Sequence, residues 1–455
     1  MSSNTTQYVA VSGEQELSSG VGVAGRCRAG VTRSLGKYLT RDILSTVATS
    51  FVLFGFMTLQ GIFLARMLGP EGRGQYATAV FYTQTFIYIG LLGTQHAIAR
   101  WAARRQNDGP ALVQTTRRLG LLTGFCTMAV VALLAFFALP TEKQYLAPLC
   151  LLCSMFLPFE HVRLLWLSVD HGRGDFRRYN WSRLAAGIAF PALLGIAWAS
   201  GANTATIVAL LFVVSPLVGL FYQRASRTTA SISALSRTAP TMKRILQRGR
   251  PYALAVMVSD LCDRLDVFLF LWLASFTAQG YYAAAVPAAN LLLVVPIALS
   301  LFAFNAGARR ERRARPASIL KTSAIILSVQ LFAAAAFAVV LEPLMVLVFG
   351  EDFRGAVPLT LALLPAYAIA GCGRIAESFL QGRNKAIIGV YTRLLGAGVM
   401  GVFIYFAFDR WAELSIPLGA LAGYTVSTTI LLLAILRDAR GISAPRDFTA
   451  EGTVP

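Results

Sequence analysis

Four charged side chains lie within seven residues of an apolar segment that is long enough to cross a membrane. The segment runs from about residue 252 to 275 and contains Asp260, Asp263, Arg264 and Asp266. At roughly 100° per residue of an α-helix, these side chains fall within one half of the helix circumference. A charge near the centre of a membrane helix costs about 2.5–3.5 kcal/mol on insertion scales, so such residues usually face a polar interior and often bind ions or substrates. We predict that the three acids bind a coupling ion, although Asp260 and Arg264, four residues apart, would also suit a neutralising pair within the helix.

Arg393 is a candidate for binding an anion. Its span begins near Ala386, which places Arg393 about 10 Å inside the span, and its own helix offers no acidic neighbour. A guanidinium in this position needs a partner, because a desolvated charge is costly unless it is paired. We expect that partner to be Asp263 or Asp266 on another helix, or an anionic substrate in a central cavity.

Two further arginines lie inside predicted spans, each three residues from an acid. Arg163 follows Glu160, and Arg374 precedes Glu377. This spacing permits a pair within the helix, and an arginine near the membrane surface can extend to the lipid headgroups, so a structural role explains both at least as well. The predicted substrate-binding residues are Arg264, Arg393, Arg163 and Arg374, and the predicted coupling-ion residues are Asp260, Asp263 and Asp266.

These charges need apolar helices to position them, and the composition supplies such helices. The chain has 455 residues, of which 56% are hydrophobic and 14% charged, with a mean hydropathy of +0.60, whereas a soluble protein carries about 25% charged residues. The composition excludes a soluble enzyme and predicts an all-α, polytopic membrane protein. Twelve apolar windows are long enough to span a membrane: approximately 43–66, 75–98, 118–139, 145–168, 182–199, 204–223, 252–275, 280–304, 318–341, 357–380, 386–408 and 415–436.

Basic residues fall mainly on one side of these windows. Of the 41 lysines and arginines, 32 lie in the N-terminal tail, the even-numbered loops and the C-terminal segment, and five lie in the odd-numbered loops. By the positive-inside rule, this bias predicts that both termini and all even-numbered loops are cytoplasmic. The net charge of +19 is then a consequence of membrane topology, and no nucleic-acid partner is expected.

The chain contains an internal duplication. Gly74-Gln-Tyr76-Ala-Thr-Ala-Val80 opens the second window and Gly280-Tyr-Tyr282-Ala-Ala-Ala-Val286 opens the eighth, at an offset of 206 residues. Both motifs follow a short external turn and precede a basic loop, so the two halves run in the same direction and should be related by an axis along the membrane normal.

The duplication divides the chain into two lobes around a central cavity. Residues 242–250, which are basic, could form an amphipathic helix on the anionic inner leaflet, or serve only to anchor the topology. We expect a disordered cytoplasmic tail (1–40), an N-lobe of six helices (41–223), a basic cytoplasmic linker (224–251), a C-lobe of six helices (252–437) and a cytoplasmic C-terminal tail (438–455).

Sequence patterns that would indicate an enzyme are absent. There is no Gly-x-x-x-x-Gly-Lys-Ser/Thr phosphate loop, so we expect no ATP hydrolysis. Cys150-x-x-Cys153 has no histidine or acidic neighbour to complete a metal site. The predicted external loops are too short to hold the catalytic domain of a membrane polymerase or glycosyltransferase. We therefore expect a transporter without enzyme activity, cofactor or metal.

Several motifs in both lobes resemble one family of transporters. The turn after the first window reads Arg66-Met-Leu68-Gly69-Pro70-Glu71-x-x-Gly74-x-Tyr76-Ala77, which resembles the signature turn of bacterial polysaccharide and O-antigen flippases, relatives of the multidrug and toxin exporters. Further matching segments are Gly172-Arg-Gly174-Asp-Phe176-x-x-Tyr179-Asn180, Arg264-x-Asp266, Gly280-x-Tyr282-x-x-Ala285 and Phe349-Gly350-Glu351-x-x-x-Gly355-Ala356-Val357-Pro358. The resemblance covers about residues 40 to 437, and the long N-terminal tail departs from it.

The resemblance implies a twelve-helix, two-lobed, V-shaped fold that works by alternating access in the bacterial inner membrane. The implied substrate is an undecaprenyl-diphosphate-linked oligosaccharide, moved from the cytoplasmic to the outer leaflet for exopolysaccharide, capsule or O-antigen synthesis, with an ion gradient or the membrane potential as the driving force. Membrane lipids, and a polysaccharide polymerase with its export machinery, are the expected partners. Two alternatives remain open: a multidrug exporter of the same superfamily, and a membrane polymerase or glycosyltransferase.

Overall fold

The computed structural model describes residues 21–104, 109–228, 240–308, 316–383 and 385–439, and these residues form helices and turns without any strand. The chain divides into two units, Met1–Ala48 and Thr49–Pro455. The first unit contains the beginning of helix α1 (Val21–Gly90). We predicted a disordered tail for residues 1–40, but residues 21–40 are helical, in a stretch that contains no proline to interrupt the helix. Residues 1–20 lie outside the described residues.

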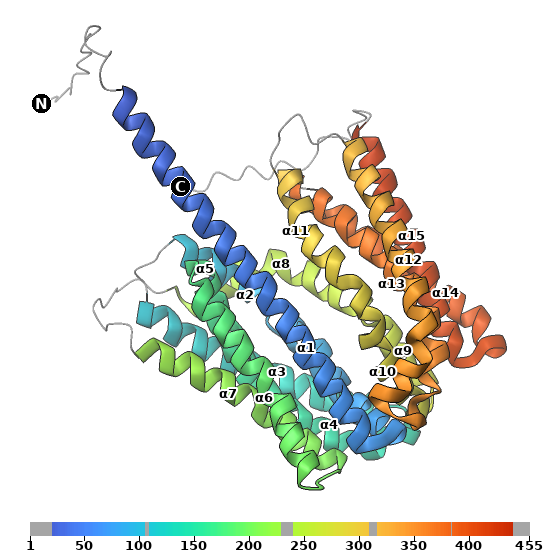
Figure 1. Ribbon diagram of the computed structural model, residues 1–455. Helices are drawn as coiled ribbons and strands as arrows, with labels where there is room; N and C mark the ends of the chain where they lie inside the picture. Colours follow the sequence, from blue (N-terminus) through green and yellow to red (C-terminus); the bar gives the residue numbers. More distant parts are fainter. Residues whose placement is uncertain (1–20, 105–108, 229–239, 309–315, 384, 440–455) are drawn as a thin grey trace, which may run out of the picture. The chain divides into compact units, whose positions relative to one another are not determined.

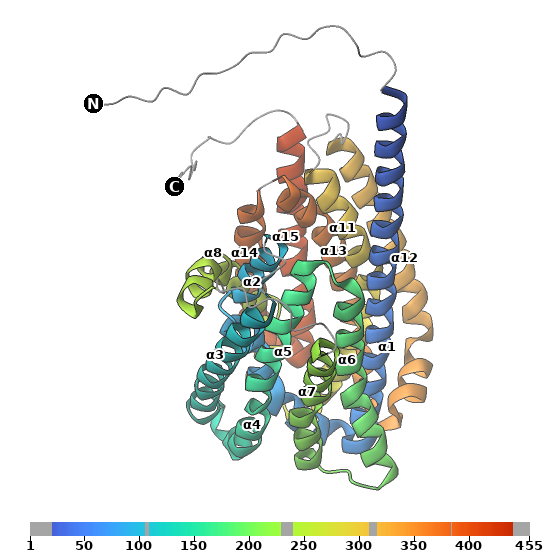
Figure 2. The ribbon, with the colours of Figure 1, turned by 90° about the vertical axis from the view of Figure 1, so that its left-hand side faces the viewer.

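The N-lobe begins in the second unit with the remainder of α1, which changes direction at Gly69, where the backbone has a φ of 63°. A positive φ favours glycine, and Pro70 then restarts the helix. Figure 2 shows several of the helices that follow. The remaining N-lobe elements are α2 (Thr94–Arg104), α3 (Gly109–Phe137), η1 (Thr141–Leu146), α4 (Ala147–Ser154), α5 (Phe156–Arg173), α6 (Phe176–Ala199) and α7 (Ala205–Thr228).

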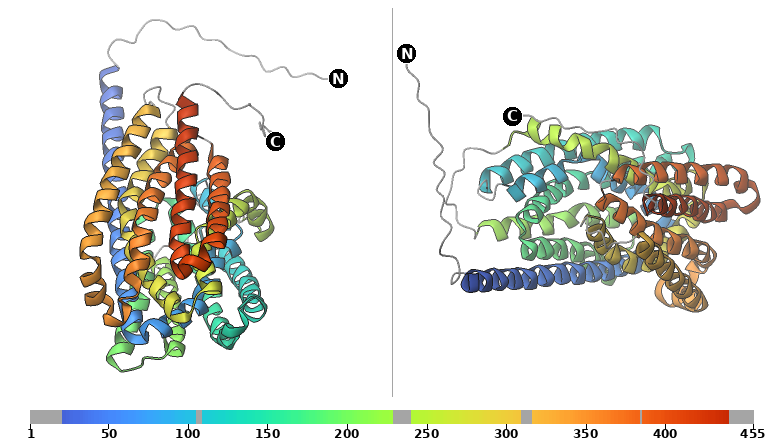
Figure 3. Two further views of the ribbon diagram at one scale, coloured as in Figure 1. Left: turned by 90° about the vertical axis from the view of Figure 1, so that its right-hand side faces the viewer. Right: turned by 90° about the horizontal axis from the view of Figure 1, so that it is seen from above.

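The C-lobe follows residues 229–239, which lie outside the described residues. Helices extend into the predicted linker (224–251) from both sides, because α7 ends at Thr228 and the first C-lobe helix begins at Met242. Figure 3 shows the C-lobe helices in front. The elements are α8 (Met242–Cys262), α9 (Leu265–Leu273), α10 (Phe276–Asn290), η2 (Leu291–Leu293), α11 (Val294–Ala308), α12 (Pro316–Phe349), η3 (Glu351–Phe353), α13 (Ala356–Gly382), α14 (Ala386–Trp411), η4 (Ala412–Leu414) and α15 (Ser415–Ala439).

Membrane spans make up most of the described residues, which contain nine helical stretches long and apolar enough to cross a membrane. Two of these stretches, Ala48–Gly90 with 43 residues and Ala386–Arg437 with 52, each cover two of the predicted windows. The predicted seventh window is divided between α8 and α9 and contains only a short apolar helix, Tyr252–Cys262. The protein is a multi-pass membrane protein, and the count of twelve spans stays a prediction.

Each lobe has its own apolar core. In the N-lobe, the rings of Phe156 and Phe212 stack with their centroids 4.3 Å apart. In the C-lobe, Phe270 and Tyr282 stack at 4.0 Å. Large apolar side chains also point outward; Phe332 is 77% exposed. An apolar exterior of this kind suits contact with lipid, because lipid chains are as apolar as the side chains.

The two lobes touch through a pair of glycines at one end of the second unit. A Cβ atom at Gly74 would overlap the backbone carbonyl of Phe276, and a Cβ atom at Gly280 would overlap that of Pro70. Both pairs of positions are separated by the offset of 206 residues found in the sequence. The contact is therefore reciprocal, as a two-fold axis between the duplicated halves requires. We call these four residues the glycine contact and this end of the molecule, where the odd-numbered loops lie, the odd-loop end (Figure 1).

Basic side chains reinforce the glycine contact by donating hydrogen bonds across it. Lys143 of the N-lobe donates to the carbonyl oxygens of Leu271 and Ala274, at 2.5 and 2.8 Å. Arg73, which is buried, donates to the carbonyl of Ala283 at 2.7 Å. Arg66 likewise donates to two carbonyl oxygens at the end of α12. The donors are thus on the N-lobe and the acceptors are backbone groups of the C-lobe.

At the opposite end, which we call the even-loop end, the first half of α8 packs against α2. Ile245 is buried in a cluster with Trp101 of α2. The guanidinium groups of Arg244 and Arg248 lie 5.4 and 5.0 Å from the Trp101 ring, a geometry that favours cation–π attraction. Residues 242–250 are helical, which was one of the two alternatives, but they pack on the N-lobe and continue directly into the apolar part of α8.

A buried ion pair holds α5 to α7 near the even-loop end. The carboxylate of Asp170 is fully buried and accepts two hydrogen bonds from Nη2 of Arg227, at 2.8 and 2.7 Å. Arg178 lies 3.7 Å away, and the Arg227 guanidinium also lies over the Trp166 ring. The pair therefore ties three helices of the N-lobe together.

Replacing one partner of this pair should destabilise the N-lobe. In Asp170→Asn the Arg227 charge is left in a buried position without its counter-ion, and breaking such a pair costs about 3–5 kcal/mol. The measurement is unfolding of the purified protein in detergent. An apolar double variant, Asp170→Leu with Arg227→Met, should lose less stability than Asp170→Asn, because it leaves no charge uncompensated. If Asp170→Asn lowered the free energy of unfolding by less than about 0.5 kcal/mol, the ion pair would not stabilise the N-lobe as assigned.

Candidate functional site

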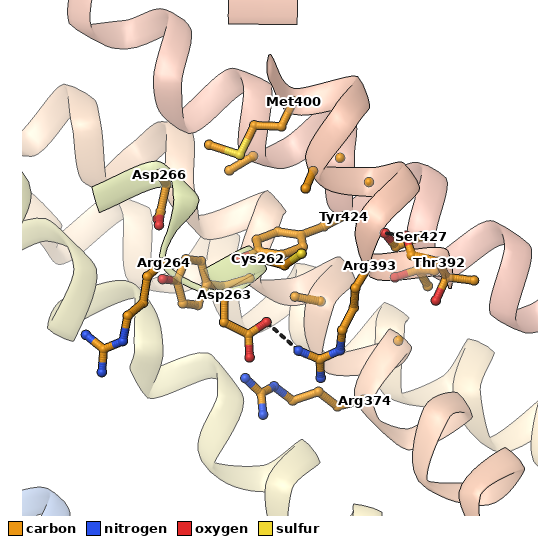
Figure 4. Close-up of a pocket in the computed structure, with 18 of the residues that line it drawn as sticks. Cys262, Asp263, Arg264, Asp266, Arg374, Thr392, Arg393, Met400, Tyr424 and Ser427 are labelled. Atoms are coloured by element: carbon orange, nitrogen blue, oxygen red, sulfur yellow. Dashed lines mark hydrogen bonds and ion pairs between the residues drawn. The ribbon is translucent and has the colours of Figure 1, made fainter. Parts of the chain in front are cut away.

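A charged cavity of about 370 Å³ lies within the C-lobe. Ligand pockets typically enclose about 300–1,000 Å³, so the volume suffices for a small polar group. We predicted a central cavity between the lobes, but all the residues that line this one belong to the C-lobe (Figure 4). Its charged lining residues are Asp260, Asp263, Arg264, Asp266, Arg374, Glu377 and Arg393.

The cavity is built around a break in a helix. α8 ends at Cys262 and α9 begins at Leu265, with Arg264 at a φ of −118°. Residues 260–266 were predicted to form one continuous helix, and that prediction is wrong. The side chain of Asp266 satisfies a backbone group that the break leaves free, because it accepts a hydrogen bond from the N–H of Val267, in the first turn of α9, at 2.8 Å. An interrupted membrane helix can line a polar cavity, where its free backbone groups find partners.

Arg393 occupies the centre of an ionic cluster. Its Nη1 lies 2.5 Å from Asp263, and its Nε and Nη2 lie 3.3 and 2.9 Å from the two carboxylate oxygens of Glu377. Of the three partners left open for Arg393, Asp263 is the one present, whereas Asp266 makes different contacts. The pairing of Glu377 with Arg393 was not predicted, because Glu377 was considered only as a partner for Arg374. The cluster joins the break after α8 to α13 and α14. Figure 4 shows the part of it between Asp263 and Arg393.

Two other arginines of the cavity make no such pair. Arg264 and Arg374 both line the cavity, and neither has a hydrogen bond or ion pair with any residue that the structure describes. Figure 4 shows Arg374 near the Asp263–Arg393 pair, and Arg264 extending from the helix break. The expected pair between Arg374 and Glu377 is not formed, and neither is the pair between Asp260 and Arg264. Both guanidinium groups therefore retain their hydrogen-bond donors for another partner.

The remaining acids of the cavity differ in their surroundings. Asp266 is buried and accepts a hydrogen bond from the hydroxyl of Tyr282, in addition to the bond from Val267. Asp260 has one buried carboxylate oxygen, Oδ2, without a hydrogen-bond partner among the described residues. Of the three acids predicted to bind a coupling ion, Asp260 is thus the one with an unused buried acceptor.

Arg163 lies apart from this cavity. It belongs to α5 in the N-lobe, where its Nε and Nη2 bond both oxygens of Glu160, at 2.7 and 2.5 Å. The predicted pair within the helix is therefore present, and Arg163 is not among the residues that line the cavity. Five residues with hydroxyl groups also line the cavity and were not predicted as site residues: Tyr367, Thr392, Tyr424, Ser427 and Thr428. Single hydroxyl groups in apolar helices give no signal of this kind, because most of them bond their own helix.

The hydrogen-bond donors that remain available in the cavity suit an anionic ligand. Four acids and three arginines line the cavity, which gives a formal net charge of −1 when all are ionised. Arg393 bonds Asp263 and Glu377, and Asp266 is bonded to Tyr282. Arg264 and Arg374 keep unused donors, and Asp260 keeps an unused acceptor. A planar guanidinium can give two parallel hydrogen bonds to a phosphate or carboxylate, and such bonds strengthen where water is scarce.

Comparisons with known proteins agree with this fold. A family model described as a polysaccharide biosynthesis protein matches residues 39–306. The structure is similar to that of the lipid II flippase MurJ in an inward closed conformation, with a TM-score of 0.68 and 12% sequence identity over 88% of this chain and 89% of that chain. It is also similar to an inward-facing multidrug resistance MATE family transporter of the MOP superfamily, with a TM-score of 0.67 and 15% identity over 85% and 94% of the two chains. A search of curated proteins finds no match. The predicted fold, an all-α transporter fold in two duplicated lobes, is confirmed.

Proposed function

The chain belongs to the polysaccharide biosynthesis protein family, and we propose that it flips a lipid-linked oligosaccharide across the bacterial inner membrane. The substrate is an undecaprenyl-diphosphate-linked oligosaccharide destined for exopolysaccharide, capsule or O-antigen. The observation that carries the proposal is the cavity of the C-lobe, where Arg264 and Arg374 have no ion-pair partner among the described residues. Both termini are cytoplasmic in this proposal, as the distribution of basic residues predicts.

The diphosphate is the part of this substrate that most needs protein contacts in order to cross the membrane. An anion cannot cross the hydrocarbon core unaided, because the loss of hydration of an unpaired charge costs many kcal/mol. Two guanidinium groups with free donors, Arg264 and Arg374, replace that hydration with charge-assisted hydrogen bonds. The hydroxyl groups of Thr392, Tyr424 and Ser427 line the same cavity, and suit the hydroxyl groups of a sugar.

The driving force in this proposal is an ion gradient or the membrane potential. Asp260 has an unbonded buried oxygen, and it takes up a proton when the anionic headgroup has left, which brings the formal charge of the cavity lining from −1 to zero during the return of the empty carrier. The membrane potential acts directly on the net charge that moves. Moving one elementary charge across the membrane changes the free energy by about 2.3 kcal/mol per 100 mV. A polysaccharide polymerase would receive the flipped substrate.

Transport into proteoliposomes tests the proposal. Purified protein should move a diphosphate-linked lipid oligosaccharide between leaflets without ATP, at a rate that responds to an imposed proton gradient or potential. Protein-free liposomes and liposomes with a denatured sample are the controls. Equal rates in both directions without any response to gradients would instead identify a scramblase. Extrusion of cationic dyes, together with no lipid movement, would identify a drug exporter and reject the proposal.

A further inference from the structure

A guanidinium lies between two carboxylates where the sequence predicted an ion site. Arg393 on α14 bonds Asp263, at the break after α8, and both oxygens of Glu377 on α13. The Arg393 side chain is 19% exposed and that of Glu377 is 13% exposed, whereas Asp263 is 39% exposed. The pair with Glu377 is thus well shielded from solvent, and the pair with Asp263 lies at the cavity surface.

The packing around Glu377 holds its carboxylate in this position. A Cβ atom at Gly389, one turn before Arg393 on α14, would lie 2.7 Å from Oε1 of Glu377. The carboxylate therefore fills the space that a side chain at residue 389 would take. Gln381 donates a further hydrogen bond to the same oxygen at 3.1 Å. Glu377 is confined between α13 and α14, and it meets the guanidinium with both oxygens.

We propose that Arg393 is a resident cation, which occupies the place between Asp263 and Glu377 that an alkali cation would otherwise take. Carboxylate oxygens from different helices are the ligands that hard cations prefer. A tethered guanidinium offers the same positive charge, and its fork matches both acids at once. While Arg393 is in place, an external Na⁺ has no free carboxylate to bind here. The inference refines the coupling step of the proposed function, because it removes Asp263 from the acids available to a coupling ion.

Removal of the guanidinium should turn this cluster into a cation site. In Arg393→Ala, Asp263 and Glu377 lose their shared counter-ion, and an unpaired carboxylate in a shielded place is strongly unfavourable. A small monovalent cation can enter the vacated volume and restore the positive charge that Arg393 supplied between the two carboxylates. Any ligand that binds the folded state but not the unfolded state raises stability. The variant should therefore acquire a stabilisation by Na⁺ that the unchanged protein lacks.

The experiment compares melting temperatures in NaCl and in choline chloride at equal ionic strength and pH 8. The unchanged full-length protein in detergent should melt at the same temperature in both salts. Arg393→Ala should melt at least about 2 °C higher in NaCl, and it should retain radioactive Na⁺ in an equilibrium binding assay. Arg393→Lys, which keeps the charge, should remain insensitive to Na⁺. These measurements need no transported lipid, so their outcome is independent of the substrate proposed above.

Two variants serve as matched controls. Arg374→Ala removes an arginine of the same cavity that pairs with no acid among the described residues, and it should gain no response to Na⁺. Asp263→Asn combined with Arg393→Ala removes one proposed ligand, and it should lose the response that Arg393→Ala acquires. The proposal is overturned if the unchanged protein is already stabilised by Na⁺ through Asp263, or if Arg393→Ala elutes as a folded protein and shows neither stabilisation nor Na⁺ binding.

Discussion

Replacing both Arg264 and Arg374 by glutamine is expected to lower the transport rate by about 100-fold or more. A hydrogen bond to a charged group contributes about 1.5–3 kcal/mol, and each 1.4 kcal/mol corresponds to a factor of about ten. Each single substitution should therefore reduce the initial rate about 10- to 100-fold. The measurement is the initial rate of flipping of a diphosphate-linked lipid in proteoliposomes with equal amounts of protein.

Charge alone and guanidinium geometry can be separated at these two residues. Arg264→Lys keeps the positive charge but loses the two-pronged fork, so its rate should lie between those of the unchanged protein and Arg264→Gln. Arg354→Gln is the matched control, because Arg354 is 61% exposed at the odd-loop end and pairs only with exposed acids. The assignment fails if Arg264→Gln with Arg374→Gln transports as fast as Arg354→Gln.

Adding a methyl group at Gly74 and at Gly280 is expected to force the lobes apart at the odd-loop end. The Cβ atoms of Gly74→Ala and Gly280→Ala would overlap backbone carbonyl groups of the opposite lobe, and a backbone cannot turn aside as a side chain can. Overpacking costs about 1–3 kcal/mol per site, which corresponds to a shift of about 5- to 150-fold in a conformational equilibrium. Together the two substitutions should strongly deplete the state in which this end is closed, and transport should stop.

Spin labels can report this separation directly. Cysteines introduced at Glu142 of the N-lobe and Arg354 of the C-lobe, in a background without native cysteines, lie at the odd-loop end and are exposed. Their distance distribution should shift to longer values in the double variant. Gly398→Ala is the control, since a Cβ atom there would meet nothing within 4 Å. An unchanged distribution in a folded double variant would show that the glycine contact does not keep this end closed.

Much of the fold was predictable because it follows from patterns along the sequence. Apolar windows and the repeat at Gly74 and Gly280 require no knowledge of distant contacts, and the repeat led to the two-lobed arrangement. The break between Cys262 and Leu265 was not predicted, because residues 252–275 contain neither glycine nor proline. The four charged residues were the only unusual feature of this segment in the sequence. A helical wheel assumes a continuous helix, so it does not reveal a break among them.

The contrast between Arg163 and Arg374 shows what spacing alone does not determine. Both lie three residues from a glutamate, but only Arg163 pairs with it. Glu160 precedes Arg163, which is the favourable order along a helix, whereas Glu377 follows Arg374. Glu377 also meets a competitor, Arg393 on the neighbouring helix. The contact between Glu377 and Arg393 depends on the packing of α13 against α14, which the sequence alone does not give. The sequence spacing therefore suggested the wrong arginine as the partner of Glu377.

The glycine contact also bears on how such a chain can change over evolutionary time. The two carbonyl groups that meet the glycines belong to Pro70 and Phe276, residues of unlike shape at equivalent places of the duplication. The contact uses only their main chain, so a change of side chain at one of these two places leaves the carbonyl contact at the other unaltered. Selection must preserve residues without a Cβ atom at positions 74 and 280, that is, Gly74 and Gly280. In the fused chain each half of the contact mutates separately, whereas in an unfused pair of identical halves one substitution would alter both at once.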